Sequence, residues 1–359
     1  MKRYDGFYFS YSVIPELSAN SIAVVKQCSS LSRHAKVLLF GIKSPGYQKH
    51  DLKAFYGIDD DFEMVLLPKE VLKFGYLPYA VIALLYYFRY RPSFIYTRDI
   101  YLSRIFCWAR LDNYYEIHQL DHNQDAFDKR FKRMFITLAA NRFLKKVVCI
   151  SNALKQDCER FGVHSKKLAV LHSASDMIRE DALINKPHIG DRPKVIYTGS
   201  TQKGKGIEMI GALAKLHPEY DFIVIGGKKE DLGHFFSNNL THLPWTSPSE
   251  VKAHLSRADI CLLPNTVQKY KFHSPLKLFD YMALGKAIVA SNIVGVNEII
   301  VDQHNGMLVT PGDISGFGAA IRTLLNDTEL KFRVEKNALD MARNHTWDKR
   351  ALSILKLVR

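Results

Sequence analysis

The sequence predicts an α/β protein made of two doubly wound domains. Its 359 residues are too many for one ordinary hydrophobic core and suit two domains of usual size. Short apolar runs alternate with longer amphipathic stretches, a β-α-β pattern that favours parallel sheets covered by helices. The alternation breaks once, over 176–192, where charged residues mix with Pro and Gly. We interpret this stretch as a linker, which predicts one domain over 1–180 and another over 181–340.

The first half of the chain contains apolar runs with the length and residue types of buried strands. They occupy residues 6–9, 35–40, 93–97, 114–118 and 146–150. Residues 20–32 and 77–90 lie between these runs and have the spacing of amphipathic helices.

The second half repeats the pattern. Strands are predicted over 194–198, 221–225, 259–264 and 287–291, and a helix over 206–216. Ligands of such sheets bind outside the carboxyl ends of the strands. We therefore expect the functional residues in the turns that follow the strands, in a cleft between the two domains.

The composition excludes several classes of protein. With 47% hydrophobic and 24% charged residues, the chain is not disordered throughout. No window reaches the roughly 18 apolar residues that a transmembrane helix needs, and the first residues lack the apolar core of a signal peptide. The 5 cysteines are scattered without a C-x-x-C pair, which argues against a disulfide framework or a zinc site. We therefore expect a cytoplasmic protein.

The formal net charge is +14 at pH 7, and basic residues are densest over 129–146, where they alternate with apolar ones. Two interpretations fit this segment: a solvated surface helix, or a helix that docks on an anionic membrane, where each basic residue adds roughly 1 kcal/mol. The aromatic and basic segment 76–91 also suits an interface, which predicts peripheral association with the inner face of the cell membrane. Nucleic acid is a third kind of partner, but no RRM, KH or zinc-finger pattern is present.

A glycine-bearing loop over 199–206 joins a predicted strand to a predicted helix. Amide groups at the start of such a helix can face an anion, and the ammonium of Lys205 can reach it as a point charge. The loop is not a Walker A sequence and lacks G-x-G-x-x-G. A solvated turn between strand and helix is therefore an equal alternative.

A more specific pattern runs over 273–291. Ser274 is a good N-cap, and Pro275 suits the first position of a helix. The free amides after the cap then form an anion site beside Lys277. Asp280 lies over one and a half turns into the helix, where its carboxylate can accept hydrogen bonds from vicinal hydroxyls. The alternative is a well-capped helix with a structural role only.

The segment 273–291 resembles the donor-binding signature of the GT-B glycosyltransferases, particularly the large retaining group that includes sugar transferases of bacterial polysaccharide and glycolipid assembly. Further segments extend this resemblance over nearly the whole chain: Ser18–Ile22, Gly199–Gly206, Asn305–Asp313 and Thr346–Asp348. The resemblance implies two Rossmann-like domains and a terminal helix over 341–359 that packs back toward the first domain. It also implies a nucleotide-sugar donor on the second domain and a saccharide or lipid-linked acceptor on the first.

The resemblance implies a role for each site residue. Lys205 neutralises the donor diphosphate together with main-chain amides around Ser274, Pro275 and Leu276, while Asp280 holds the ribose. Further donor contacts fall on Asn20, Gly199, Ser200, Trp245, Thr246 and Lys277. For Trp245, contact with the base and a place in an interface are equal alternatives. UDP- and GDP-sugars are the expected donors, and no metal is required because amides and lysines stabilise the departing diphosphate.

In the first domain, His118 ends the predicted strand 114–118 and resembles the family's cleft histidine. It is expected to orient the transferred sugar or to stabilise positive charge at the anomeric carbon; the alternative is a strand-end histidine with a structural role. Glu116 lies two residues earlier and points to the same side, where it either orients the ring or caps a neighbouring helix. His118, Lys205 and Asp280 are thus the predicted catalytic residues.

Two positions depart from the family's pattern. Many retaining members have a Glu where this chain has Phe272, and a Phe cannot accept a hydrogen bond from a sugar hydroxyl. The family's frequent Arg after the loop glycine is Ser200 here, which removes one phosphate partner. The sequence therefore leaves the identity of the donor sugar open.

These patterns predict a metal-independent glycosyltransferase that moves a hexose-type sugar to a saccharide or lipid-linked saccharide in cell-surface polysaccharide, lipopolysaccharide or capsule biosynthesis. Retention is implied by the resemblance, in which the leaving phosphate deprotonates the acceptor; inversion with His118 as the base is the alternative. A non-catalytic sugar-binding subunit on the same scaffold and a sugar-nucleotide epimerase are the other candidates.

Overall fold

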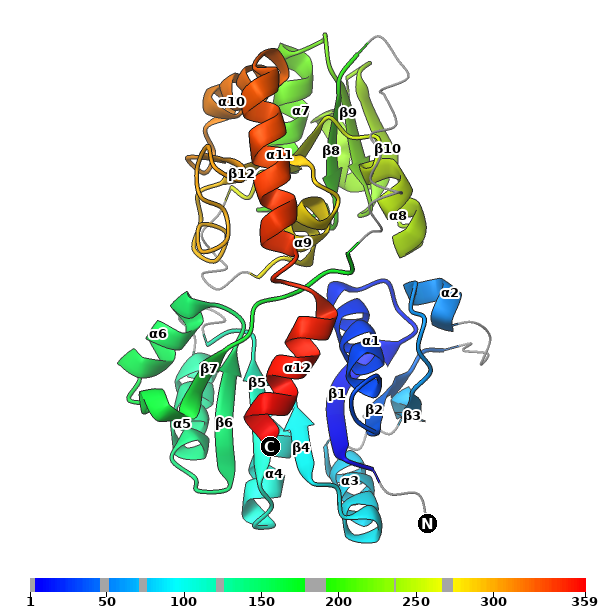
Figure 1. Cartoon of the computed structure of the whole chain (residues 1–359), viewed down its shortest axis with the longest axis vertical. Helices are drawn as coiled ribbons and strands as arrows, with labels where there is room; N and C mark the ends of the chain where they lie inside the picture. Colours follow the sequence, from blue (N-terminus) through cyan, green and yellow to red (C-terminus); the bar gives the residue numbers. More distant parts are fainter. Residues whose placement is uncertain are drawn as a thin grey trace. The chain divides into compact units, whose positions relative to one another are not determined.

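The structure is a computed structural model that describes residues 4–45, 52–70, 76–120, 126–177, 192–235, 237–266 and 274–359. It contains two compact units, each built on its own sheet (Figure 1). Unit 1 comprises Met1–His172 and Trp347–Arg359, and unit 2 comprises Ser173–Thr346. The chain thus returns to unit 1 with its last helix. The sequence suggested boundaries after residues 180 and 340, and most of the expected linker, 178–191, lies outside the described residues.

Unit 1 is built on a parallel sheet with 7 strands. The strands are β1 (Gly6–Ile14), β2 (Val37–Lys43), β3 (Glu63–Leu67), β4 (Phe94–Thr97), β5 (Asn113–Ile117), β6 (Leu144–Cys149) and β7 (Leu168–Val170). Their order is β3-β2-β1-β4-β5-β6-β7. The winding reverses between β1 and β4, and doubly wound sheets bind their ligands at such a switch point.

Helices cover both faces of this sheet (Figure 1). They are α1 (Ala19–Ser32), α2 (Leu52–Tyr56), α3 (Leu77–Tyr90), α4 (Ile100–Trp108), α5 (Ala126–Ala139), α6 (Asn152–Arg160), the 3-10 turn η2 (Ser165–Lys167) and α12 (Trp347–Val358). Successive side chains of β1 alternate between two cores. Tyr8 packs with residues of α1 and α12, whereas Phe7 and Phe9 pack with residues of α3 and α4.

Unit 2 repeats this architecture with a sheet of 6 strands in the order β10-β9-β8-β11-β12-β13. The strands are β8 (Lys194–Thr198), β9 (Asp221–Ile225), β10 (Leu240–Leu243), β11 (Ile260–Leu263), β12 (Ala287–Ser291) and β13 (Met307–Val309). The helices are α7 (Ile207–Leu216), the 3-10 segment η4 (Lys229–Phe235), α8 (Pro248–Leu255), α9 (Leu276–Ala283), α10 (Ile314–Asn326) and α11 (Thr328–Ala342). The winding reverses between β8 and β11, which defines the second switch point.

The predicted fold class is confirmed, and each predicted strand is present. The strands 194–198, 221–225 and 287–291 have the predicted bounds, and the ends of the others are shifted by up to five residues. Of β10 the sequence marked only the end, at 243–244, and the strands β3, β7 and β13 were not predicted. All three are edge strands whose side chains are mostly only partly buried, so their apolar signal is weak. Within the described residues, no helix is long and apolar enough to cross a membrane.

Candidate functional site

The first group of site residues lies in unit 2, in the loop between β8 and α7. Gly199 has a φ of +128° and Gly206, the N-cap of α7, a φ of +86°. Both angles lie in the left-handed region that favours glycine. A Cβ at Gly199 would collide with Nζ of Lys277, and one at Gly206 would collide with the carbonyl oxygen of Pro264. The loop glycines are therefore required by backbone conformation and by close packing, and α7 begins where the sequence predicted.

Two ammonium groups approach this loop. Nζ of Lys277, in the first turn of α9, lies 3.9 Å from the centroid of the Tyr197 ring, a cation–π contact. Burial and then repulsion by Lys205 lower the pKa of Lys277 well below its usual range. Burial also lowers the pKa of Lys205. In the described parts of the chain no carboxylate pairs with Lys277. A partly buried cation beside a second cation is stabilised when an anion binds, so this loop is a candidate anion site.

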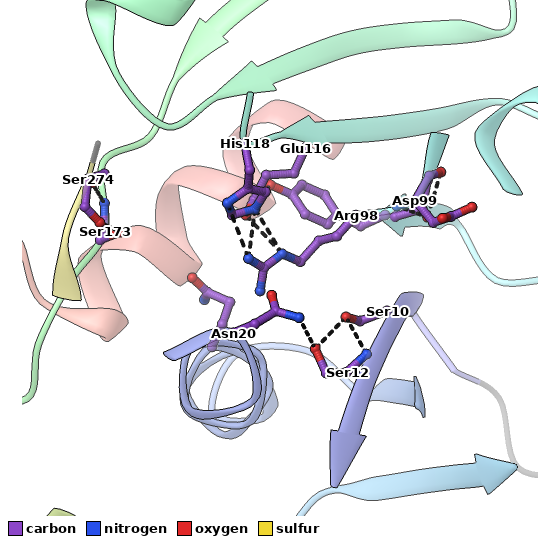
Figure 2. Close-up of polar contacts among 12 residues, drawn as sticks. Ser10, Ser12, Asn20, Arg98, Asp99, Glu116, His118, Ser173 and Ser274 are labelled. Atoms are coloured by element: carbon purple, nitrogen blue, oxygen red, sulfur yellow. Dashed lines mark hydrogen bonds and ion pairs between the residues drawn. The ribbon is translucent and has the colours of Figure 1, made fainter. Parts of the chain in front are cut away.

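Ser274 does not cap α9, and this part of the sequence-based prediction is wrong. The N-cap is Pro275, without a side-chain capping bond, and the helix begins at Leu276. Ser274 instead bonds to Ser173: its Oγ accepts from the Ser173 amide at 2.8 Å, and its carbonyl accepts from the Ser173 hydroxyl at 2.7 Å (Figure 2). These bonds hold the chain before α9. The amides of Leu276 and Lys277 still open the helix, so the anion site keeps its main-chain donors.

Asp280 lies on α9, where the sequence predicted it. Its Oδ1 accepts a hydrogen bond from the Ser175 hydroxyl at 2.5 Å, and the amide of Ser175 donates to the carbonyl of His345 at 3.0 Å. The carboxylate is partly exposed and has further acceptor positions. Sequence reasoning missed Ser175, because 105 residues separate it from Asp280 and no local pattern links the two.

The other residues predicted to contact the donor follow neighbouring strands at the same edge of the sheet. Trp245 is 48% exposed, and its ring packs on Gly226, where a Cβ would lie 3.0 Å from it. Thr246 donates its hydroxyl to Glu250 in α8. The carbonyl of Ser200 accepts from the hydroxyl of Tyr197 at 2.6 Å. Phe272 lies outside the described residues.

The second group of site residues lies in unit 1 and centres on Glu116 of β5, which is 2% exposed. Its Oε2 accepts from Nη2 of Arg350 at 2.8 Å and from the hydroxyl of Tyr96, and its Oε1 lies 2.9 Å from Nε2 of His118. Burial raises the pKa of Glu116, but the charges of Arg350 and Arg98 and the hydrogen bond from His118 outweigh it and hold this pKa well below the usual range. Glu116 therefore orients the ring of His118, the first of its two predicted roles.

His118 follows β5, and 39% of its side chain is exposed. Figure 2 shows Arg98, from the turn after β4, and Asn20, from α1, directed toward the same space as His118. Nη2 of Arg98 lies 2.7 Å from Nε2 of His118. Burial and then the charge of Arg98 lower the pKa of His118, so its ring is neutral near pH 7. Asn20 donates from Nδ2 to Oγ of Ser12 at 2.7 Å.

Arg98 and Arg350 are site neighbours that the sequence analysis missed. Arg98 directly follows a predicted buried strand, and this position was the available signal. No sequence signal pointed to Arg350, because it lies on α12, 234 residues from Glu116 along the chain. Within the described residues, no group of three or more His, Cys, Asp or Glu side chains could hold a metal ion.

Comparisons with known proteins show which families and folds this chain resembles. The family model described as Glycosyl transferases group 1 matches residues 192–327, which include the glycine loop and α9. Sucrose-phosphate synthase from Thermosynechococcus elongatus has a TM-score of 0.77 at 18% identity, covering 98% of this chain and 97% of that chain. HepE of Anabaena, solved in complex with UDP, has a TM-score of 0.77 at 17% identity, covering 98% of each chain.

Curated sequences agree over a shorter span. An uncharacterised glycosyltransferase of Methanocaldococcus jannaschii, MJ1178, is 21% identical over 59% of this chain and 58% of its own length. The N,N'-diacetylbacillosaminyl-diphospho-undecaprenol alpha-1,3-N-acetylgalactosaminyltransferase of Campylobacter jejuni is 25% identical over 55% of this chain and 52% of its own length. The chain thus spans little more than half the length of these two relatives.

Two parallel, doubly wound sheets, together with the likeness to solved structures over almost the whole chain, define the GT-B fold. The chain therefore has the GT-B fold, and its residues 192–327 match the family model of the glycosyl transferases group 1.

Proposed function

We propose that this protein transfers a sugar from a nucleotide-sugar donor to a saccharide or lipid-linked acceptor in cell-surface polysaccharide biosynthesis. The observation that carries the proposal is the pair Lys205 and Lys277 beside the glycine loop, with Lys277 partly buried and without a carboxylate partner in the described residues. A diphosphate supplies the negative charge that this pair requires. As the bond to the sugar breaks, charge develops on the diphosphate, and the ammonium groups stabilise it.

In this proposal the remaining unit 2 residues hold the nucleoside. Asp280 accepts hydrogen bonds from the ribose hydroxyls, Trp245 lies against the base, and amides of Leu276 and Lys277 bind the phosphates. The structural relative from Anabaena was solved with UDP, which supports a uridine donor over the GDP alternative. The amides and lysines carry the electrostatic role, so the proposed reaction requires no metal.

The proposed chemistry proceeds with retention. The acceptor hydroxyl attacks the anomeric carbon as the sugar–phosphate bond breaks, and its proton passes to the leaving phosphate. The neutral ring of His118 hydrogen-bonds the transferred sugar rather than taking the proton. Inversion would require His118 to act as the base. The anomeric configuration of the product, read from its proton coupling constant, distinguishes the two courses.

A screen of nucleotide ligands tests the donor side of the proposal. We expect UDP or a UDP-sugar to raise the melting temperature of the full chain, since a ligand at 100 times its Kd stabilises by about 2.7 kcal/mol. GDP, ADP and CMP ligands serve as matched comparisons. If no nucleotide changes the melting temperature at saturating concentration, the proposed function is wrong.

A non-catalytic sugar-binding subunit is the second candidate. It is favoured by Ser200 and Phe272, which stand where many members of the family have Arg and Glu. Such a subunit binds the nucleotide sugar but neither hydrolyses nor transfers it. Release of UDP from UDP-sugar, with and without added acceptor, separates the candidates. An epimerase would convert the donor sugar in the absence of any acceptor.

We further propose that unit 1 docks on an anionic membrane that presents the acceptor. Three apolar side chains of α3 are strongly exposed: Leu77 (71%), Leu85 (65%) and Phe88 (55%). Trp108, at the end of α4, is 85% exposed. Exposed arginines lie on these two helices or directly after them, at Arg89, Arg91, Arg104 and Arg110. Apolar side chains that insert among lipids beside basic groups that meet their phosphates suit an anionic interface.

Replacing Leu85 and Phe88 together with serine is expected to lower membrane binding at least tenfold, because each large apolar side chain contributes about 1.5–3 kcal/mol when buried. Co-sedimentation with phosphatidylglycerol-containing vesicles at low salt measures the membrane binding. Leu216→Ser in unit 2, at a position 63% exposed, is the matched control and is expected to bind as the unmodified protein does. If the unmodified protein does not bind these vesicles, the membrane proposal is wrong.

A further inference from the structure

The cluster around Glu116 contains one carboxylate and two guanidinium groups, all deeply buried. The side chains of Arg98 and Arg350 are each 8% exposed. Arg350 is fully engaged: Nε donates to the carbonyl of His172 at 2.9 Å, Nη1 to Oε1 of Gln27 at 2.7 Å, and Nη2 to Oε2 of Glu116 at 2.8 Å. The negative charge of Glu116 thus compensates the positive charge of Arg350, which bonds to Oε2. The charge of Arg98 remains in excess.

No other titratable side chain of the cluster supplies the missing negative charge. Burial and Arg98 lower the pKa of His118, so the ring is neutral or positive but never negative. Burial and then Glu116 raise the pKa of Tyr96 well above its usual range, so its hydroxyl stays neutral. Burial raises the pKa of Tyr8 in the same way. The cluster therefore has a net charge of about +1 near pH 7.

Asp99 is the carboxylate nearest to Arg98 in the sequence, but it bonds to the start of α4 instead of to Arg98. Its Oδ1 accepts from the amide of Leu102 at 2.7 Å and so caps α4. In Figure 2 its carboxylate points away from the guanidinium of Arg98. Within the described residues, the ion pair of Arg98 is with Glu116 alone, at 3.3 Å. An excess buried charge is costly unless a partner of opposite sign completes the site.

The surroundings of Arg98 are polar and partly exposed. They lie at the switch point of the first sheet, after β1, β4 and β5. His118 beside Arg98 is 39% exposed on its side chain, Asn20 is exposed, and α1 starts with no acidic residue in its first turn. Figure 2 shows Arg98, His118 and Asn20 converging from three elements, with Ser12 hydrogen-bonded to Asn20.

We propose that Arg98 anchors a binding site in unit 1 for an anionic group, a phosphate or carboxylate carried by the acceptor. A planar guanidinium matches both groups in geometry and charge. This inference rests on the proposed function, because that function assigns the donor diphosphate to Lys205 and Lys277 of unit 2. The acceptor thus belongs to the class of phosphorylated or acidic saccharides, with its anionic group against Arg98 and Asn20.

Inorganic phosphate is the probe for the first experiment, in full-length protein that carries Lys205→Gln and Lys277→Met so that unit 2 no longer holds an anion. Phosphate is titrated against chloride at constant ionic strength while the ring resonances of His118, assigned with His118→Gln, are followed by NMR. We expect a saturable shift. Adding Arg98→Gln is expected to weaken phosphate binding about tenfold or more, the loss of one charge-assisted hydrogen bond.

Arg160→Gln is the matched control, because it removes the same charge from an exposed position on α6 of the same unit. It is expected to leave the phosphate response unchanged. Arg98→Lys keeps the positive charge but lacks the planar set of N–H donors, and it is expected to retain part of the phosphate affinity. This variant separates loss of binding from loss of folding. A saturable response that survives Arg98→Gln, or no response in the parent protein, overturns the proposal.

A second experiment distinguishes the acceptor's anionic group from free phosphate. Paired acceptors with and without a phosphate are compared in the transfer assay; Arg98→Gln is expected to raise KM for the phosphorylated one about tenfold and to leave KM for the neutral one unchanged. Equal effects on both acceptors contradict the acceptor assignment. If the proposed function itself is wrong, no nucleotide binds, while the phosphate response of His118 persists.

Discussion

Replacing Lys277 with methionine is expected to lower sugar transfer by about 100-fold or more and to abolish stabilisation by nucleotide. The ammonium lies in a partly buried loop beside Lys205, where electrostatic interactions with a developing diphosphate are stronger than in water. Methionine keeps the unbranched apolar stem of the side chain and lacks only its terminal ammonium. Steady-state kinetics and calorimetric titration with the preferred nucleotide measure the two losses.

The same substitution is expected to stabilise the protein without ligand. Folding lowers the pKa of Lys277 below its usual 10.5 through burial and repulsion by Lys205, so the unfolded chain binds this proton more tightly. Stability therefore rises with pH up to about 10.5 in the unmodified protein, and Lys277→Met removes this contribution. A purely structural lysine would show the opposite pattern, with lower stability and unchanged nucleotide affinity after substitution.

Lys203→Met is the matched control for this prediction. Lys203 lies in the same loop but is exposed, and an exposed charge at that position is screened by solvent. We expect its nucleotide affinity and transfer rate to stay within about threefold of the unmodified protein. If both lysine variants lose activity equally, the loop acts through its total charge rather than through the buried ammonium.

Replacing Glu116 with glutamine is expected to destabilise the protein by about 3–5 kcal/mol. The two guanidinium groups of Arg98 and Arg350 then lose their shared carboxylate while remaining buried. Glutamine keeps the shape of the side chain and an oxygen for the Tyr96 hydroxyl, so the loss reports charge rather than packing. Chemical denaturation followed by circular dichroism measures the change in free energy of unfolding.

Two further variants test whether the lost negative charge causes this destabilisation. Glu63→Gln changes a carboxylate of the same sheet that accepts from the Tyr4 hydroxyl at 2.6 Å, and it is expected to cost only about 1 kcal/mol. The double variant Glu116→Gln with Arg350→Met is expected to be more stable than the sum of its single variants. An additive result would show that Glu116 and Arg350 do not interact.

Most of the architecture could be predicted from the sequence because its signals are local. The apolar runs of 194–198 and 287–291 became β8 and β12 with the expected ends, since buried parallel strands read as short continuous hydrophobic segments. Gly206 marked the start of α7, because its backbone conformation disfavours other residues. The expected cap at Ser274 was wrong because Ser173, from a distant segment, bonds to it instead.

The sequence by itself determined two doubly wound sheets and the residue types at the carboxyl ends of their strands, because helix and strand periodicity, capping and glycine conformation depend on neighbours along the chain. Only the tertiary structure decided that Lys277 lies against Lys205 and that Arg350 of the last helix is buried against Glu116. Charge compensation inside a protein depends on distance in space and on burial. Neither quantity has a signature in the order of the residues.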